Sequence, residues 1–230
     1  MKKMPLAFFS LFLVSAMFVF PQGSFLKPGQ HGLGVSGAFS TNADLSGVAG
    51  TLTYTLAGIF DFSFSLGRAS YDADSALADL KQTSIVPEVR AYIVKQNSGR
   101  SPITASVSIG WDRDNYSSPD LTAESFDMWA RTLLLGAAVY RDIPVFQKAY
   151  IQPFVGITHL STTLKVTDTT TGLTVTTTDA MIALNLGVPL VYGLSDKAIL
   201  IVQPGVSFDK NNTTLSISAG LVYALSKAKI

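Results

Sequence analysis

Hydrophobic and polar residues alternate at every second position from about residue 30 to the end of the chain. The segment 60–67 illustrates the pattern: one face carries Phe60, Phe62, Phe64 and Leu66, and the other carries Asp61, Ser63, Ser65 and Gly67. The segments 103–112 and 215–225 repeat it. A period of two places alternate side chains on opposite faces of an extended strand and is therefore typical of β-structure.

Ten segments of this kind follow one another along the chain. Their predicted boundaries are 30–40, 45–56, 60–70, 84–95, 102–114, 127–141, 149–163, 178–192, 198–209 and 213–225. Each is about as long as a tilted strand that crosses a bilayer. We therefore expect one all-β domain, a closed antiparallel transmembrane β-barrel of about ten strands in meander order, with eight strands as the alternative.

The connections between these segments differ in length on the two sides. Those near 57–59, 96–101, 142–148 and 193–197 are short, whereas those near 71–83, 115–126 and 164–177 are longer and polar. Barrels of the bacterial outer membrane have short turns in the periplasm and longer loops outside. The Thr-rich stretch 161–178 predicts a hairpin that projects beyond the outer leaflet, and 75–81 is the one segment with a weak helical pattern.

The composition of the second face separates a membrane barrel from a soluble one. That face is mostly Gly, Ser, Thr, Ala and Asn, and charged residues make up 14% of the chain, against about 25% in soluble domains. Such residues suit a crowded interior better than a hydrated surface. Prolines at 87, 153, 189 and 204 predict bulges or strand ends, because proline lacks a backbone donor.

The first residues resemble an export signal. Lys2 and Lys3 precede an apolar run from Pro5 to Ala16, which predicts a signal peptide within 1–24, cleaved between 16 and 24, followed by a barrel domain over 25–230. A single membrane anchor is the alternative. The chain has 17 basic and 16 acidic residues; without Lys2 and Lys3 the balance is 15 to 16, or −1. The basic residues are scattered, which excludes a nucleic-acid partner, and the absence of cysteine excludes disulfides and thiolate metal sites. No cofactor or metal is expected.

With its signal (Lys2 to Ala16), its alternating segments such as 60–67 and its closing segment 215–225, the chain resembles the small bacterial outer-membrane β-barrel proteins of the OmpA transmembrane-domain, OmpX and OmpW types. The resemblance covers residues 30–225 and is one of pattern. It implies a Gram-negative cell envelope, outer-membrane lipids as surroundings, and insertion by the barrel-assembly machinery. Members often end in Phe, whereas this chain ends at Ile230. The oligomeric state stays open.

Aromatic residues near the strand ends predict two lipid-facing girdles, because amphipathic rings favour the headgroup level. The turn-side girdle is expected to contain Tyr54, Phe60, Tyr140, Tyr150, Tyr192 and Tyr223, and the loop-side girdle Phe39, Trp111, Trp129 and Phe208.

Five charged residues fall on the predicted lumen face: Asp61, Glu88, Arg90, Asp112 and Asp114. Buried charges need partners, so we expect an interior network in the lumen. Residues 32–37 match the dinucleotide-binding pattern G-x-G-x-x-G but open no helix, so small residues that line a barrel wall are the better interpretation.

His159 and Ser161 lie two residues apart and share the lipid-facing side of a predicted strand. Outer-membrane lipid A deacylases have a similar His-x-Ser, followed by Asn and a more distant acid. Here Thr162 replaces the Asn, and Asp168 or Asp179 would have to supply the acid.

Three functions are therefore open. The first is a non-catalytic integral outer-membrane barrel of structural, interaction or small-pore type. The second is a lipid hydrolase that uses His159 and Ser161. The third is a soluble periplasmic barrel that binds an apolar ligand.

Overall fold

A computed structural model describes residues 22–71, 79–96, 101–210 and 212–227. The strands of these residues are β1 (Gln30–Thr41), β2 (Leu45–Leu56), β3 (Phe60–Tyr71), β4 (Lys81–Val94), β5 (Thr104–Ser117), β6 (Phe126–Tyr140), β7 (Ile143–Phe146), β8 (Ala149–Ile151), β9 (Phe154–Asp168), β10 (Thr174–Gly187), β11 (Leu190–Gly193), β12 (Ala198–Phe208) and β13 (Thr213–Lys227). The helices are α1 (Gln22–Phe25) and α2 (Pro119–Ala123). Neither of these two helices is long and apolar enough to cross a membrane.

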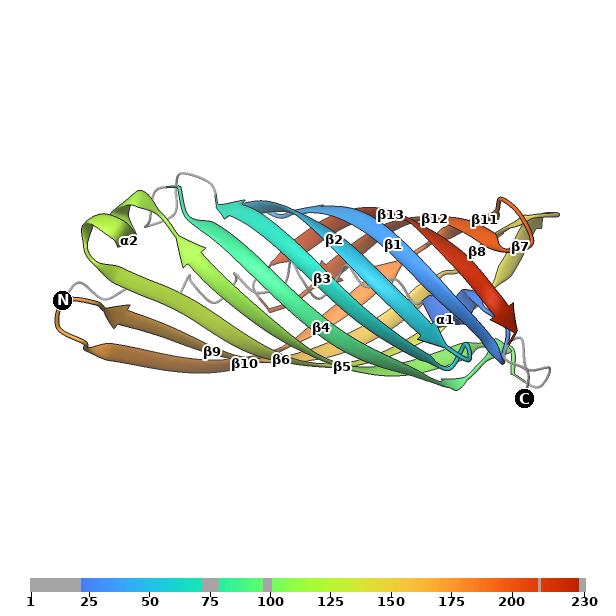
Figure 1. The fold of residues 1–230 in the computed structure, drawn as a ribbon, viewed down its shortest axis with the longest axis horizontal. Helices are drawn as coiled ribbons and strands as arrows, with labels where there is room; N and C mark the ends of the chain where they lie inside the picture. Colours follow the sequence, from blue (N-terminus) through green and yellow to red (C-terminus); the bar gives the residue numbers. More distant parts are fainter. Residues whose placement is uncertain (1–21, 72–78, 97–100, 211, 228–230) are drawn as a thin grey trace.

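The strands close into a tilted antiparallel barrel (Figure 1). Its ring runs β1-β2-β3-β4-β5-β6-β9-β10-β12-β13 and closes where β13 pairs with β1. β8 continues β9 toward the turn side, β11 continues β10 in the same way, and β7 adds a short hairpin beside β8. The barrel thus has ten strand positions around its ring, here called staves, in meander order. The prediction of ten is confirmed.

Two of the four prolines singled out in the sequence interrupt a stave. Pro153 separates β8 from β9, and Pro189 separates β10 from β11. Their carbonyl groups still accept bonds, from the Arg141 amide at 3.1 Å and from the Gln152 amide at 2.9 Å. Pro87 and Pro204 lie inside β4 and β12 without ending them. The missing proline donors therefore divide two staves without opening the barrel.

The two faces of the strands differ as the alternation predicts. Phe62 and Phe64 on β3 are 44% and 47% exposed on the outer surface, while Ser63 and Ser65 are 6% and 1% exposed. On β5, Val107 and Ile109 are exposed and Ser106 is buried. A soluble ligand-binding barrel would reverse this arrangement, because its large apolar side chains would line the interior.

The loop side contains a helix that the sequence pattern did not predict. Ser118 caps α2: its hydroxyl accepts the Leu121 amide at 3.1 Å, and Pro119 occupies the first turn. The signal was present as Ser-Pro-Asp, a common helix start, within the predicted loop 115–126. The weak helical pattern at 75–81 falls mostly on residues 72–78, outside the described residues.

The Thr-rich segment forms the expected hairpin. β9 and β10 continue to Asp168 and Thr174, which reduces the predicted loop 164–177 to the connection 169–173. Asp168 closes it by accepting the amides of Thr170 and Thr171 at 2.8 and 3.1 Å. This hairpin extends to the end of the molecule where α2 lies (Figure 1).

Candidate functional site in the barrel lumen

The mouth of the barrel on the turn side is filled by residues 22–26, a segment that we call the N-terminal plug. It consists of α1 and Leu26, and every residue in it is buried. In Figure 1, α1 lies within the end of the barrel where the short turns gather. Since short turns mark the periplasmic side, the N-terminal plug closes the periplasmic mouth.

Two glycines of β1 provide the space for the N-terminal plug. A Cβ atom on Gly34 would meet the Gln22 amide group, and one on Gly32 would lie 2.4 Å from Leu26 Cδ1. Both glycines belong to the G-x-G-x-x-G pattern. Their role here is to let the plug approach the barrel wall closely, which agrees with the interpretation as small lining residues.

Asp61 of β3 binds the backbone of the N-terminal plug. Its carboxylate oxygens accept the Gly23 amide at 2.9 and 3.0 Å. The hydroxyl groups of Thr55 and Tyr92 donate to the same carboxylate at 2.7 and 2.6 Å. Gly23 cannot carry a side chain here, because a Cβ atom would lie 2.4 Å from the Tyr92 ring. A buried carboxylate with several donors is well satisfied, so Asp61 is a specific anchor.

Lys95, just beyond the end of β4, holds the same segment from the other side. Its ammonium group donates to the carbonyls of Gly23, Leu26 and Gly58, the last at 2.8 Å. Gly58 lies in the β2–β3 turn at a φ of 62°. Burial lowers the pKa of Lys95 to about 8, although Asp61 and Asp142 act in the opposite direction. Lys95 therefore fastens the plug to the barrel rim.

A chain of side-chain hydrogen bonds extends from the N-terminal plug to the periplasmic turns. The Ser24 hydroxyl donates to Gln152 at 3.1 Å, and the Gln152 amide donates to Asp142 at 2.6 Å. The Asp142 amide in turn donates to the Gln96 side chain at 2.7 Å. The plug is therefore tied to two periplasmic connections as well as to the wall.

The apolar part of the N-terminal plug packs against the last staves. Phe25 and Leu26 form one buried cluster with residues of β11, β12 and β13: Val191, Ile201, Val222 and Ala224. Tyr150 of β8 packs against Phe25, with ring centroids 6.4 Å apart. Apolar burial thus supplements the polar anchors.

Above the plug lie the remaining charges of the lower lumen. Arg90 forms an ion pair with Glu88 at 3.0 Å and donates to the Tyr140 hydroxyl at 3.2 Å. Arg90 and Tyr140 also line a partly open cavity of about 70 Å³ together with small residues of β5, β6 and β9. A cavity of that size holds a few water molecules.

Asp112 and Asp114 form a separate polar group nearer the loops. Asp114 accepts hydrogen bonds from the Gln82 amide and the Ser84 hydroxyl, and Tyr71 donates to Gln82 at 2.6 Å. The five charged residues named in the sequence analysis all face the lumen, as their alternation predicts. The structure brings Asp61, Glu88 and Arg90 together in the lower lumen and places Asp112 and Asp114 apart from them.

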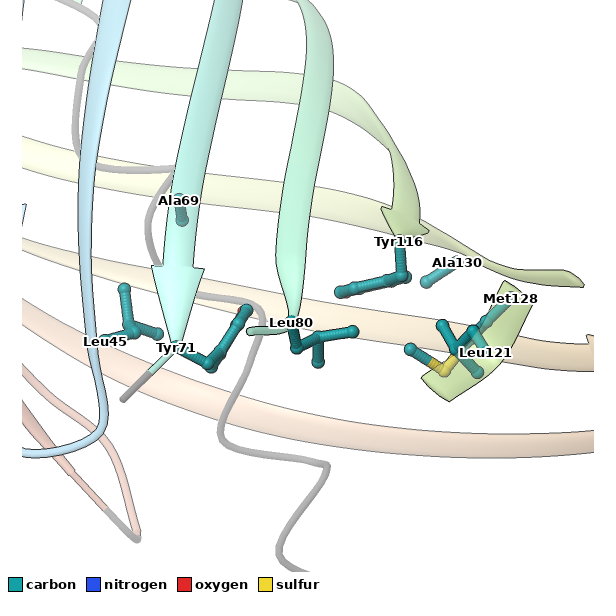
Figure 2. Close-up of a cluster of buried hydrophobic side chains, with 8 residues drawn as sticks. All are labelled: Leu45, Ala69, Tyr71, Leu80, Tyr116, Leu121, Met128 and Ala130. Carbon is teal, nitrogen blue, oxygen red and sulfur yellow. The ribbon is translucent and has the colours of Figure 1, made fainter. Parts of the chain in front are cut away.

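An apolar cluster, here called the loop-side cap, lies beyond this second group (Figure 2). Its buried members come from five strands or their ends and from α2: Leu45, Ala69, Tyr71, Leu80, Tyr116, Leu121, Met128 and Ala130. Leu121 brings α2 into the cluster, and Phe126, Leu164 and Val166 pack around it. The cap fills the extracellular end of the lumen with side chains.

The aromatic residues divide between the outer surface and the lumen. Those exposed on the outer surface are Phe39, Tyr54, Phe60, Trp111, Tyr192, Phe208 and Tyr223, and Trp129 is half-buried. Tyr140 instead lies in the lumen with Arg90, and Tyr150 packs on Phe25. Placing these two tyrosines in a lipid-facing girdle was wrong. The Tyr140 hydroxyl accepts a hydrogen bond from Arg90 in the lumen, and the Tyr150 ring packs against Phe25 of the plug.

His159 and Ser161 both lie on the outer face of β9. His159 is opposite Leu135 and Ile182, and Ser161 is opposite Leu133 and Ala180. Asp168 accepts the Thr170 amide in the β9–β10 turn, and Asp179 forms an ion pair with Lys210 at 3.2 Å. The structure therefore brings neither candidate acid to the histidine.

A closed ten-stranded barrel with a continuous apolar outer band and a small polar interior defines a class, the transmembrane β-barrels of bacterial outer membranes. The apolar band needs a lipid surrounding, and the antiparallel meander with short turns on one side is the outer-membrane architecture. The protein is thus an integral protein of the outer membrane.

Solved structures agree with this fold. The translocator domain of the autotransporter NalP from Neisseria meningitidis aligns with 12% sequence identity over 86% of this chain and 90% of that chain, with a TM-score of 0.53. The outer membrane protease OmpT from Escherichia coli aligns with 9% identity over 86% and 98%, with a TM-score of 0.48. Ail, the attachment invasion locus protein of Yersinia pestis, aligns with 10% identity over 86% and 100%, with a TM-score of 0.43.

At such identities the likeness to NalP shows the fold alone, and TM-scores below 0.5 add nothing to it. No protein-family model matches the sequence. No curated protein matches it either. The resemblance to small outer-membrane barrels is nevertheless confirmed at the level of the fold.

Sequence reasoning missed the N-terminal plug and Lys95. The available signals were an acidic and a basic residue near one barrel end, Asp61 and Lys95, and two lumen-facing glycines, Gly32 and Gly34. None of them indicates by itself which segment they hold, because the plug reaches them only through the closure of the barrel.

Proposed function

We propose that this protein is a sealed, non-catalytic outer-membrane barrel that anchors and displays its extracellular β9–β10 hairpin rather than conducting solutes. The N-terminal plug is the observation that carries the proposal, which requires that the predicted signal be cleaved before Gln22. Asp61 and Lys95 bind its backbone from two sides, at the Gly23 amide and at the Gly23 and Leu26 carbonyls, and Gly32 and Gly34 leave the space in which it lies. Hydrogen bonds to the backbone of the plug, together with the space left by the two glycines, support a specific closure of the periplasmic mouth.

The loop-side cap supports the same function. A conducting lumen needs a continuous aqueous path, and the buried side chains of Tyr71, Leu121 and Met128 fill the lumen on the extracellular side. Between the two closures lies the cavity of about 70 Å³. With the lumen closed, the surfaces that the described residues leave for interaction include the outer wall, the segment around α2 and the extracellular hairpin.

Single-channel recording in planar bilayers tests the seal. We expect the wild-type protein to insert without conductance steps, and the Asp61→Ala variant to show frequent openings, because Gly23, Thr55 and Tyr92 lose their shared acceptor. The Ser65→Ala variant is the matched control. Ser65 is also a buried lumen residue of β3, but its partner is Thr51 and not the plug.

Steady conductance of the wild-type protein would contradict the proposal. So would an Asp61→Ala variant that stays as silent as Ser65→Ala. Heat-modifiable gel migration of each variant shows that a closed barrel was reconstituted. A hydrolytic function has no comparable support, since His159 has Leu135 and Ile182 as its cross-strand neighbours.

A further inference from the structure

Four basic residues gather on one part of the outer wall near the loop side: Arg68 of β3, Arg113 of β5, Arg131 of β6 and Lys165 of β9. We call this set the cationic arc. β5, β6 and β9 are consecutive staves, and β3 is separated from β5 by β4 alone. The arginines are exposed and Lys165 is half-buried.

The cationic arc begins where the apolar outer band ends. On β3 the outward row of phenylalanines and Leu66 is followed by Arg68, and on β5 Trp111 is followed by Arg113. On β6, Leu133 is preceded by Arg131. These side chains therefore lie at the level where the hydrocarbon of the outer leaflet meets its headgroups.

Two of the arginines face each other directly. Arg113 and Arg131 are register partners on β5 and β6, and residues in such pairs have Cβ atoms roughly 5 Å apart. Like charges in that position are destabilising. Among the described residues, neither Arg113 nor Arg131 forms an ion pair with a carboxylate.

Trp129 organises the next row of the cationic arc. It is the register partner of Lys165, whose ammonium nitrogen lies 5.0 Å from the centroid of its ring, and the Arg131 guanidinium carbon lies 4.8 Å from that centroid. Cation–π contacts hold basic side chains near an aromatic ring without removing their charge. The two cations are thus positioned beside one ring and can still bind an anion.

The arrangement is confined to one side of the barrel. At the same boundary on β1, β2 and β13, the outward residues are neutral: Thr41, Ser46 and Thr213. Acidic side chains do occur near the arc, at Asp127 of β6 and at Asp120 and Glu124 around α2, but they lie farther toward the loops than the arginine pair. The charge at the hydrocarbon boundary is therefore positive.

We infer that the cationic arc binds the phosphate groups of a phosphorylated glycolipid of the lipid A type in the outer leaflet. Arginine forks match phosphate oxygens in geometry and charge. An anion between Arg113 and Arg131 offsets their repulsion. Acyl chains that descend from the bound headgroup would follow the apolar wall formed by Trp111, Ile109 and Leu133, so a lipid fits better than a soluble anion.

Tryptophan fluorescence provides a direct test. The chain has two tryptophans, and both Trp111 and Trp129 border the cationic arc. The full-length protein in neutral detergent is titrated with bisphosphorylated lipid A, with the same lipid after dephosphorylation, and with inorganic phosphate. We expect saturable binding of the bisphosphorylated lipid, and binding about 25-fold weaker for the double variant Arg113→Gln/Arg131→Gln.

The Arg113→Lys/Arg131→Lys variant keeps the charge and is expected to retain most of the binding. Lys148→Gln/Lys197→Gln removes two exposed charges from the periplasmic turns and is expected to bind like the wild type. Equal binding by the Arg113→Gln/Arg131→Gln variant, or of the dephosphorylated lipid, would overturn the inference. Inorganic phosphate that binds as tightly as the lipid would overturn the assignment to a membrane lipid.

Discussion

The two ends of the barrel are closed by different kinds of interaction. At the periplasmic mouth, Asp61 and Lys95 bind particular backbone atoms of the N-terminal plug. At the extracellular end, the side chains of Tyr71, Leu121 and Met128 pack in an apolar cluster, to which the hydrogen bond from the Tyr71 hydroxyl to Gln82 adds one polar contact. The plug therefore depends on a few directed bonds, whereas the cap depends on many small contacts spread over five strands and a helix.

This difference has a physical consequence. Loss of one buried hydrogen-bonding group leaves its partners unsatisfied, and the cost falls on one segment. Loss of one apolar side chain leaves a cavity, which neighbouring side chains partly fill. We therefore expect single substitutions such as Asp61→Ala to open the periplasmic mouth, but we do not expect single substitutions to open the extracellular end.

The largest effect at the extracellular end is expected for Leu121→Ala. The change removes the buried side chain that joins α2 to the loop-side cap, at a cost of about 3 kcal/mol. Limited proteolysis within 118–125 should accelerate by roughly a hundredfold, while planar-bilayer recordings stay silent. Leu173→Ala, at an exposed position of the β9–β10 turn, is the control and should change neither quantity.

A smaller effect is expected for Ser118→Ala, which removes the hydroxyl that accepts the Leu121 amide. Loss of a helix N-cap costs about 1 kcal/mol, so proteolysis of the same segment should accelerate by roughly fivefold. The Ser118→Asp variant restores a capping acceptor and should return the rate to that of the wild type. A rate for Ser118→Ala as high as that of Leu121→Ala would mean that capping and not packing holds α2.

The smallest effect is a pH dependence at the periplasmic mouth. In the sealed mouth the pKa of Lys95 is lowered from 10.5 to about 8. Between these values the sealed form binds fewer protons than the unfolded chain, so stability rises as the pH increases through that window. Asp61 and Asp142 are the charged groups that face Lys95.

Heat-modifiable gel migration measures this dependence. The temperature at which the barrel unfolds should be a few degrees higher at pH 9.5 than at pH 7.5, and the Lys95→Met variant should lose most of that difference. An unfolding temperature that falls with pH in the wild type alone would contradict the assignment to Lys95.

The alternation of the sequence was sufficient to predict the staves. For β1, β2, β3, β12 and β13 the predicted boundaries agree with the structure within about two residues. Each side chain in such a strand faces either the lipid or the lumen. A one-residue shift of the strand would exchange these two environments, so the register of the strand is strongly constrained. The Thr-rich hairpin was also predicted, because its residue types favour strands around a single turn.

One of the two misplaced tyrosines, Tyr140, lies on a strand with apolar residues on both faces. On β6 the inward face includes Met128 and Leu134, and the outward face includes Leu133 and Leu135. Tyr140 was assigned to a girdle because it lies near a strand end, and the position along a strand does not say which face a side chain occupies. Its place beside Arg90 follows from the strand register, which brings β4, β5 and β6 together.

By itself, the sequence determined the class of fold, the number of staves and the direction in which most side chains point, because all three follow from a local period of two and from the spacing of turns. Only the tertiary structure decided that Gln22 to Leu26 lies buried in the periplasmic mouth and that Arg113 faces Arg131. Closure of the ring brings Gly23 to Asp61, 38 positions away, and Ser24 to Gln152, 128 positions away. Contacts over such distances depend on shear and register, which no local pattern encodes.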